Sequence, residues 1–465
     1  MTFPKNSVLL LSAILFLSAC ASYYQQQANF NQKFTAGNLE AAKRYLEQHD
    51  KQAEKKDRLL YFLDRGVVEH LLGNYQESNF YFEEAYIFTQ DFRKSFSGDF
   101  LEMTANPMLR PYRGEDFEVV LIHFYKTLNF IKLGRLNDAL IEVRRINIKL
   151  NKLNDRYEDK KNRYKVDAFA LNLMGMIYEA RGNYNDAFIA YRNAYVAYAE
   201  VYADAFNVSV PQQLKHDLIR MAAYNGFRQE QEMYEKQFGI EYQKQSPQQP
   251  MLNFFWLNGL GPVKGEFSLN LTSLSNGQNG VLTFANEAEG FSIPVNSNQL
   301  NGQGDLNDLN FIRMAVPRYN TRQPMASGAA IVYKEQNFPL ALAEDIESIA
   351  RSTLKDRLAR ELAKSVGRLA IKQAAQAAVR KENEDLGSLV SILNAVTEKA
   401  DTRNWQSLPH SISYVRIPLD TAVNDLKLSV NYANGQDTIR FKWNANTLQD
   451  VFLSHHSLGS SKPII

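Results

Sequence analysis

The spacing of apolar residues divides the chain into a helical first half and a strand-rich second half. From 29 to 242, apolar side chains recur every three or four residues and prolines are few, which predicts amphipathic helices. Beyond 250, apolar and polar residues alternate, as at Phe267 and Leu269, and this period of two predicts β-strands. The Gln-, Pro- and Ser-rich stretch 243–250 lies between the two patterns and is expected to be a linker.

The second half returns to helical spacing before it ends in strands. Apolar residues three and four apart predict a long amphipathic helix from about 341 to 398. Leu426 and Leu428 then alternate with polar residues, and Asn434-Gly435 predicts a β-hairpin. We therefore expect an α+β fold. It has a helical domain at 29–242, a mixed domain of short strands with a long helix at 251–452, and a flexible tail at 453–465, which contains His455-His456.

The first twenty residues have the pattern of a cleaved export signal. Lys5 precedes a mostly apolar run at 8–17. This run is too short to cross a hydrocarbon core of ~30 Å, which takes about 20 residues, but it suits the core of a signal peptide. The run ends in Leu-Ser-Ala-Cys, with the cysteine at Cys20, and this motif resembles the lipobox of bacterial lipoproteins.

That resemblance implies a lipid anchor. In the lipoprotein family the cysteine sulfur carries a diacylglyceryl thioether, cleavage falls between Ala19 and Cys20, and the new amine is acylated. We therefore expect a signal peptide at 1–19 and a lipidated residue with a short tether at 20–28, held stably by two or more acyl chains. Ala21 stands where enterobacterial lipoproteins of the inner membrane have Asp, which by resemblance favours the outer membrane. We expect the folded body to face the periplasm. The alternative is an ordinary secretory signal with an incidental cysteine.

Three segments of the helical half share one internal spacing of small and large residues. In each, a glycine ends the first helix because it adopts the left-handed cap conformation at low cost. An aromatic residue or leucine follows two positions later, and small residues stand where two helices approach. The positions expected to pack within the repeats are Gly66, Gly73, Tyr75, Ala85, Gly134, Ala139, Gly175, Gly182, Tyr184, Ala187 and Ala194.

This spacing resembles the tetratricopeptide repeat (TPR) pattern. The capping glycines stand 61 and 48 residues apart, so the repeats are irregular, and residues 29–48 are compatible with a partial first repeat. The resemblance implies helix pairs stacked into a curved array whose concave face holds peptides or protein partners. The alternative is an unrelated helical bundle with chance spacing.

Composition and charge exclude several classes of protein. Apolar residues make up 45% of the 465 positions, which is typical of a packed globular protein. With 53 basic and 51 acidic residues the net charge is only +2, so no general affinity for nucleic acid is expected. The single cysteine excludes an internal disulfide and a Cys-rich zinc site. We expect no metal and no cofactor.

One helix departs from this even charge balance. Between Arg351 and Lys381, nine basic residues stand against Asp356 and Glu361, a local charge of +7. The simplest interpretation is a helix packed on the sheet with a solvated basic face. The alternative is an anionic envelope partner, such as lipid or lipopolysaccharide headgroups. The candidate contacts for that partner are Arg357, Arg360, Lys364 and Arg368.

Two further patterns have both a structural and a functional interpretation. Glu115, Asp116 and Glu118 open a helix, where acidic residues favour the helix dipole. Carboxylates can also serve a glycan-processing enzyme, which needs no local sequence motif. An aromatic stripe is expected to pack in the core, with an exposed partner or glycan groove as the alternative. Its members are Tyr191, Tyr195, Tyr198, Tyr202 and Phe206.

The sequence favours a non-enzymatic function. It contains no nucleophile elbow, no His-Glu-x-x-His and no P-loop, and no catalytic residue is assigned. The block Asp401 to Pro409 resembles a segment of a poorly characterised group of bacterial envelope lipoproteins, which implies no activity and no site residue. We expect an outer-membrane lipoprotein that scaffolds protein partners in cell-wall synthesis, secretion or surface-organelle assembly. The alternatives are a peptidoglycan- or glycan-processing enzyme and a binder of anionic envelope lipid through residues 351–381.

Overall fold

The computed structural model describes most of the chain after the predicted signal. Cys20, Arg360, Lys364 and Arg368 lie outside the described residues, so the expectations for them stay predictions. The described residues are 23–51, 55–95, 108, 110–155, 162–247, 249–273, 281–286, 291–296, 311–358, 400–419, 423–444 and 449–463.

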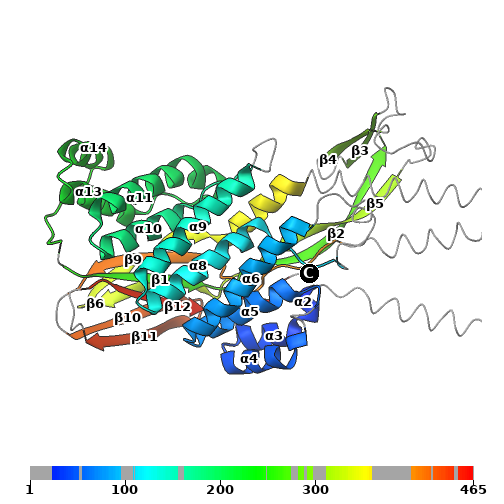
Figure 1. The fold of residues 1–465 in the computed structure, drawn as a ribbon, viewed down its shortest axis with the longest axis horizontal. Helices are drawn as coiled ribbons and strands as arrows, with labels where there is room; N and C mark the ends of the chain where they lie inside the picture. The colour runs from blue at the N-terminus through cyan, green and yellow to red at the C-terminus, as the bar shows by residue number, and fades with distance from the viewer. Residues whose placement is uncertain are drawn as a thin grey trace, which may run out of the picture.

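The first half of the described chain contains five helix pairs (Figure 1). A glycine with a φ between 71° and 83° stands in the turn of every pair: Gly37, Gly73, Gly134, Gly182 and Gly226. These angles lie in the left-handed region, which glycine adopts without steric cost. The pairs are α3 (Ala28–Thr35) with α4 (Leu39–Gln48), α5 (Arg58–Leu71) with α6 (Tyr75–Ser95), α8 (Asp116–Lys132) with α9 (Leu136–Asn154), α10 (Ala168–Ala180) with α11 (Tyr184–Ala197), and α13 (Gln212–Tyr224) with α14 (Arg228–Phe238).

Consecutive pairs stack as a repeat array. The second helix of one pair contacts the first helix of the next, as α6 does with α8, α9 with α10, and α11 with α13. The predicted TPR-like helical half is therefore present, and residues 29–48 fall within the first pair, α3–α4. The fifth pair, α13–α14, was not among the predicted repeats.

The aromatic stripe lies in a helix that changes its pitch. After α11 the chain forms one π-helical turn, η4 (Tyr198–Tyr202), and then α12 (Ala203–Phe206). Tyr191, Tyr198 and Tyr202 are fully buried. Tyr195 is half-buried and contacts Phe238 of α14, with ring centroids 5.1 Å apart. The stripe packs inside the protein and forms no exposed groove.

The second half forms three four-stranded sheets. The first sheet has the order β12 (Val451–Ser457), β1 (Met251–Asn258), β9 (Ser411–Pro418), β8 (Ala341–Asp345). The second has the order β11 (Gly435–Asn444), β10 (Val423–Tyr432), β6 (Ala326–Tyr333), β7 (Gln336–Pro339). The third has the order β4 (Phe291–Asn296), β3 (Val281–Asn286), β2 (Val263–Ser273), β5 (Phe311–Asn320). Tyr432 pairs with Gly435, which confirms the predicted hairpin.

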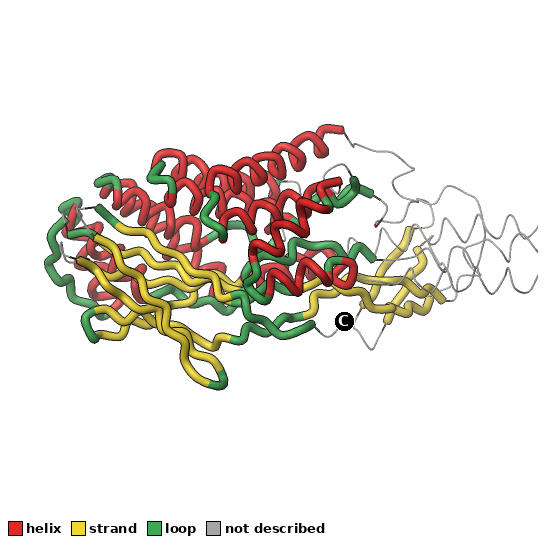
Figure 2. Tube along the Cα trace, turned by 90° about the horizontal axis from the view of Figure 1, so that it is seen from below, coloured by secondary structure: helices red, strands yellow, loops and turns green. Residues whose placement is uncertain are grey.

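The first sheet is the middle of three layers, between the helices and the second sheet (Figure 2). All eight residues of β1 are buried. Phe255 and Leu257 belong to the core shared with the helices, whereas Phe254 and Trp256 belong to the core shared with the second sheet. The third sheet extends beyond the helical array at one end (Figure 1).

These layers correct the predicted domain organisation. One apolar core contains helical residues together with residues of β1, β8 and β9, so the segment 243–250 connects two parts of one core. The tail predicted at 453–465 is wrong, because β12 pairs in parallel with β1 and contains His455 and His456. The His456 ring nitrogen Nε2 lies 2.8 Å from the Gly259 carbonyl oxygen.

The described part of the predicted tether is folded and does not form a flexible linker. Helix α2 (Tyr23–Gln26) begins three residues after Cys20. Tyr23 is buried, and its backbone N–H donates to the Thr402 hydroxyl at 3.1 Å. Within the described parts of the chain, no helix is both long and apolar enough to cross a membrane.

Candidate functional site

The structure places the predicted repeat-packing residues between the helices of each pair. A Cβ atom on Gly66 would lie 2.7 Å from the Phe82 ring, and one on Gly175 would lie 2.4 Å from the Tyr191 ring. Such distances leave no room for any side chain but hydrogen. Tyr75 packs edge-on against His70, and Tyr184 packs edge-on against Tyr224. The alanines are fully buried: Ala85, Ala139, Ala187 and Ala194.

The first helices of the repeats form an inner face that is covered by the chain itself. We define the inner face as the surface of α5, α8, α10 and α13 toward the first sheet. Phe169 of α10 packs on Phe255 of β1 and Tyr414 of β9, with ring centroids 5.9 and 6.1 Å apart. Because the TPR resemblance implies partner binding at the concave face, this surface was the expected binding site. It is already occupied in cis.

Residues 400–410, here called the Trp405 segment, extend this internal cover. The Trp405 ring packs against Phe82 and Tyr125 at centroid distances of 5.9 and 5.7 Å. Its backbone N–H donates to Glu118 Oε1 at 2.7 Å. Its indole N–H donates to Ser407 Oγ at 2.8 Å. A segment without regular secondary structure thus lies on the array and is anchored there by an aromatic ring.

The predicted carboxylate cluster joins three parts of the molecule. Glu115 Oε1 pairs with Lys264 of β2 at 2.5 Å, and Glu115 Oε2 pairs with Arg357 at 2.7 Å. Glu118 Oε2 accepts from the Tyr112 hydroxyl at 2.6 Å and from the Glu115 backbone N–H at 2.9 Å. Asp116 lies in the first turn of α8, as the helix-dipole interpretation expects.

The two buried carboxyl groups differ in pKa. Burial, reinforced by the charge of Glu115, raises the pKa of Glu118 to about 7. Burial also disfavours ionisation of Glu115, but Arg357 and Lys264 outweigh it and lower the pKa of Glu115 to about 2. Every carboxyl oxygen of the two residues has a partner within the chain. This arrangement stabilises the junction and leaves no oxygen directed at a substrate.

A second buried charge network joins β9 to the helices. Arg416 is fully buried, and its Nη1 lies 2.9 Å from both Glu179 and Asp217. Arg220 also pairs with Glu179, at 2.8 Å. The sequence analysis did not single out this network. Its available signal was the pair Asn253 and Arg416, two polar residues inside strand patterns, which are opposite each other and hydrogen-bonded at 2.7 Å.

The described start of the predicted basic helix packs into the protein through its own ion pairs. Residues 346–358 are helical. Arg357 pairs with the buried Glu115, and Arg351 pairs with Glu347 at 2.9 Å. Arg357 is therefore engaged inside the protein, whereas the anion-binding prediction for Arg360, Lys364 and Arg368 concerns residues beyond those described.

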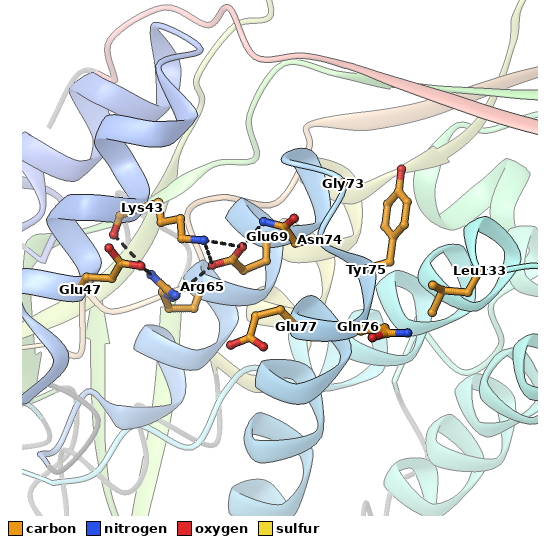
Figure 3. A pocket seen from close by; sticks show the side chains of 10 residues that line it. All are labelled: Lys43, Glu47, Arg65, Glu69, Gly73, Asn74, Tyr75, Gln76, Glu77 and Leu133. Atoms are coloured by element: carbon orange, nitrogen blue, oxygen red, sulfur yellow. Dashed lines mark hydrogen bonds and ion pairs between the residues drawn. The ribbon is translucent and has the colours of Figure 1, made fainter.

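An open polar groove of about 600 Å³ lies at the junction of the first two helix pairs (Figure 3). The Glu69 carboxylate forms ion pairs with Lys43 Nζ at 3.1 Å and with Arg65 Nη2 at 2.9 Å. Arg65 also pairs with Glu47 at 3.2 Å. Figure 3 shows these side chains converging between α4 and α5, with the Gly73 turn alongside. The lining residues are Lys43, Glu47, Arg65, Glu69, Gly73, Asn74, Tyr75, Gln76, Glu77 and Leu133.

The groove suits a charged, hydrogen-bonding segment better than a metal ion. Among its charged lining residues, Lys43, Glu47 and Glu77 are at least partly exposed, whereas Arg65 and Glu69 are buried and paired with each other. In the part of the chain that the structure describes, no group of three or more His, Cys, Asp or Glu residues is arranged to hold a metal. Gly73 and Tyr75 line the groove as well as packing the repeat, which their spacing alone did not indicate.

No family model and no curated protein matches the chain. Among solved structures, the chain is similar to MamA, with a TM-score of 0.28 and 13% identity over 44% of this chain and 89% of that one. BtubC from P. vanneervenii has a TM-score of 0.32 and 12% identity over 47% and 81%. A Podosopora anserina kinesin light chain with nearly identical TPR-like repeats has a TM-score of 0.30 and 16% identity over 46% and 92%. The TPR-like character rests on this chain's own helix pairs and turn glycines.

Proposed function

We propose that this chain is a lipid-anchored, non-enzymatic scaffold on the periplasmic side of a bacterial outer membrane, which binds a protein partner through its helical repeats. The observation that carries the proposal is the filled inner face of the array next to an open groove. The Trp405 segment and the first sheet cover the inner face, whereas the groove around Glu69 stays accessible. A polypeptide segment with charged side chains fits such a groove.

The proposed anchor adds a geometric constraint. Only Ala21 and Ser22 separate Cys20 from the buried Tyr23. At about 3.5 Å per residue, an acylated Cys20 would lie within about 10 Å of the folded body. The scaffold would therefore rest against the membrane instead of moving on a long tether, and the groove would have a restricted range of orientations.

Photo-cross-linking from the groove tests the partner. A photoreactive amino acid at Gln76 in the full-length lipoprotein, in cells, is expected to give an adduct with one envelope protein. The same group at Ala433, in the exposed turn between β10 and β11, is the matched control. The identity of the adduct would separate cell-wall synthesis from secretion or organelle assembly. No adduct at Gln76 beyond that at Ala433 would contradict the partner site.

The anchor is tested separately. We expect wild-type protein to incorporate labelled palmitate and to fractionate with the outer membrane, and Cys20→Ser to lose both properties. If Cys20→Ser is processed and fractionates as the wild type does, the anchor is wrong. This result would leave the groove experiment interpretable, because Gln76 belongs to the folded body.

A further inference from the structure

The exposed apolar residues of the repeats occupy equivalent positions. Counted from the turn glycine of each pair, the seventh residue is Phe80, Ile141, Ile189 or Met233, with exposed fractions of 55%, 48%, 38% and 50%. The fourteenth residue is Ile87, Ile148 or Val196 in the three longer second helices. These seven residues are most of the nine large apolar side chains that are exposed in the described chain.

These positions form a defined outer face, the surface of α6, α9, α11 and α14 that carries the seven residues. Seven residues make almost two helical turns, so the seventh and fourteenth side chains point in nearly the same direction, about 10.5 Å apart. A single exposed apolar residue is ordinary on a protein surface. Recurrence at one repeat position in four consecutive pairs indicates instead that this face contacts another apolar surface.

Charged residues flank the apolar positions with opposite signs. The fourth residue after the turn glycine is acidic: Glu77, Asp138, Asp186 or Glu230. The tenth residue is basic in three pairs: Arg144, Arg192 and Lys236. In α6 the tenth residue is Glu83, which pairs with Lys126 of the chain itself. The acidic and basic positions stand three residues before and three residues after the seventh position.

The pattern of acidic and basic positions on the outer face is complementary to the same pattern on a second copy of the chain. A half-turn about an axis through the seventh position exchanges the fourth and tenth positions of a helix. With the axis at Ile189, Asp186 of one copy faces Arg192 of the other. In such a contact α9 would lie over α14, where Asp138, which also pairs with Arg135 of its own helix at 2.8 Å, would face Lys236 and Glu230 would face Arg144. A two-fold contact between identical surfaces is the commonest symmetry of soluble oligomers.

We propose that the outer face of α9, α11 and α14 binds a second copy of this chain through a two-fold contact centred on Ile189. Apolar residues meet near the axis, and each acidic position meets a basic position of the other copy. The inner face is filled in cis and does not compete for this contact. The inference goes beyond the scaffold function, because it concerns self-association and does not use the groove around Glu69.

Cross-linking through a residue on the axis gives the first test. The chain has one natural cysteine, Cys20, so Ile189→Cys adds a single new thiol to the full-length protein. A short bis-maleimide applied to membranes is expected to produce a covalent dimer of Ile189→Cys. The unmodified chain measures any background from Cys20, and Ala433→Cys is the matched exposed control. Cross-linking of Ile189→Cys no greater than that of both controls would overturn the proposal.

A charge exchange gives the second test. In detergent-solubilised full-length protein, Asp186→Arg or Arg192→Asp alone places like charges opposite each other twice per dimer. Each is expected to weaken the dimer about tenfold or more. The double variant restores opposite charges and should recover the wild-type dissociation constant, measured by sedimentation. Circular dichroism checks that each variant is folded.

A double variant that associates no better than the single variants would overturn the two-fold pairing. A wild-type chain that stays monomeric over the whole concentration range would overturn it as well. Neither result depends on whether Gln76 cross-links to a partner, so failure here and failure of the scaffold proposal are distinguishable.

Discussion

The inner face of the helical repeats buries polar side chains, whereas the outer face of the same repeats exposes apolar ones. On the inner face, α8 buries even Glu118, whose carboxyl oxygens accept from the Trp405 backbone N–H and the Tyr112 hydroxyl. On the outer face, α9 of the same pair exposes Ile141 and Ile148. Where the chain covers this inner face with its own strands, charged groups such as Glu118 and Arg416 are paired within the chain.

The largest effect should come from removing the anchor of the inner face. Trp405→Ala deletes a fully buried ring that contacts Phe82 and Tyr125, and it should lower the free energy of unfolding by about 3–5 kcal/mol. Denaturant titration measures this. Met325→Ala, at a side chain that is 58% exposed, should change stability by less than about 0.5 kcal/mol. Equal effects of the two changes would contradict the internal role of Trp405.

A smaller loss is expected where two helices approach most closely. Gly175→Val would force a side chain into the Tyr191 ring, whose hydroxyl is held by Glu179. Overpacking of this kind typically costs about 1–3 kcal/mol. Gly328→Val, in β6, is the control because a Cβ there meets no atom within 4 Å. Thermal unfolding measures both variants. If the two substitutions lower the unfolding midpoint equally, the helices do not approach tightly at Gly175.

The pH dependence of stability should also report on the inner face. Burial raises the pKa of Asp64 to about 7, and the charge of Glu118 adds to this while the Ser407 hydroxyl opposes it. In an unfolded chain the pKa of Asp is about 3.9. Between these values the folded state keeps a proton that the unfolded state has lost, so this group lowers stability as pH rises from about 4 to 7.

Asp64→Asn removes that titration and keeps an acceptor for Ser407. The decrease in unfolding free energy between pH 5 and 6.5 should become less steep by up to about 1.4 kcal/mol per pH unit. Denaturant titrations at several pH values measure the slope, and Asp437→Asn in the exposed hairpin should leave it unchanged. A slope in Asp64→Asn that equals that of the wild type would contradict the buried environment of Asp64.

The smallest change in stability is expected for a substitution on the outer face. Ile148→Ser, at a side chain that is 52% exposed, should change the stability of the dilute protein by less than about 0.5 kcal/mol. Chemical denaturation at low protein concentration measures this. A loss as large as that of Trp405→Ala would show that Ile148 is part of a core, and the contrast between the two faces would fail.

Local patterns in the sequence predicted the helix pairs well. Gly73, Gly134 and Gly182 mark turns because a capping glycine and the small residues around it act within a few positions of each other. The fifth pair escaped detection because α14 is mostly polar, with Tyr234 as its buried residue. The acidic start of α8 was interpreted as a dipole effect, and its capping box agrees with that, but its partners Lys264 and Arg357 could not be inferred.

Contacts between distant residues account for what the sequence did not predict. Trp405 binds Glu118 across 287 positions, and no periodicity connects the two. The strand β12 resembled a tail because its partner β1 lies about 200 residues earlier and runs parallel to it. Parallel pairing has no hairpin signal such as Asn434-Gly435, so its register depends on the layers already assembled around β1.

The central claim is that helices and strands form one core, closed on the inner face of the repeats. The most direct test is thermal unfolding of a fragment that ends before the first sheet, residues 23–247, followed by circular dichroism. Without β1, β9 and the Trp405 segment, the apolar inner face is exposed, so we expect no cooperative transition. A sharp transition with the midpoint of the whole protein would show that the repeats fold independently and would contradict the claim.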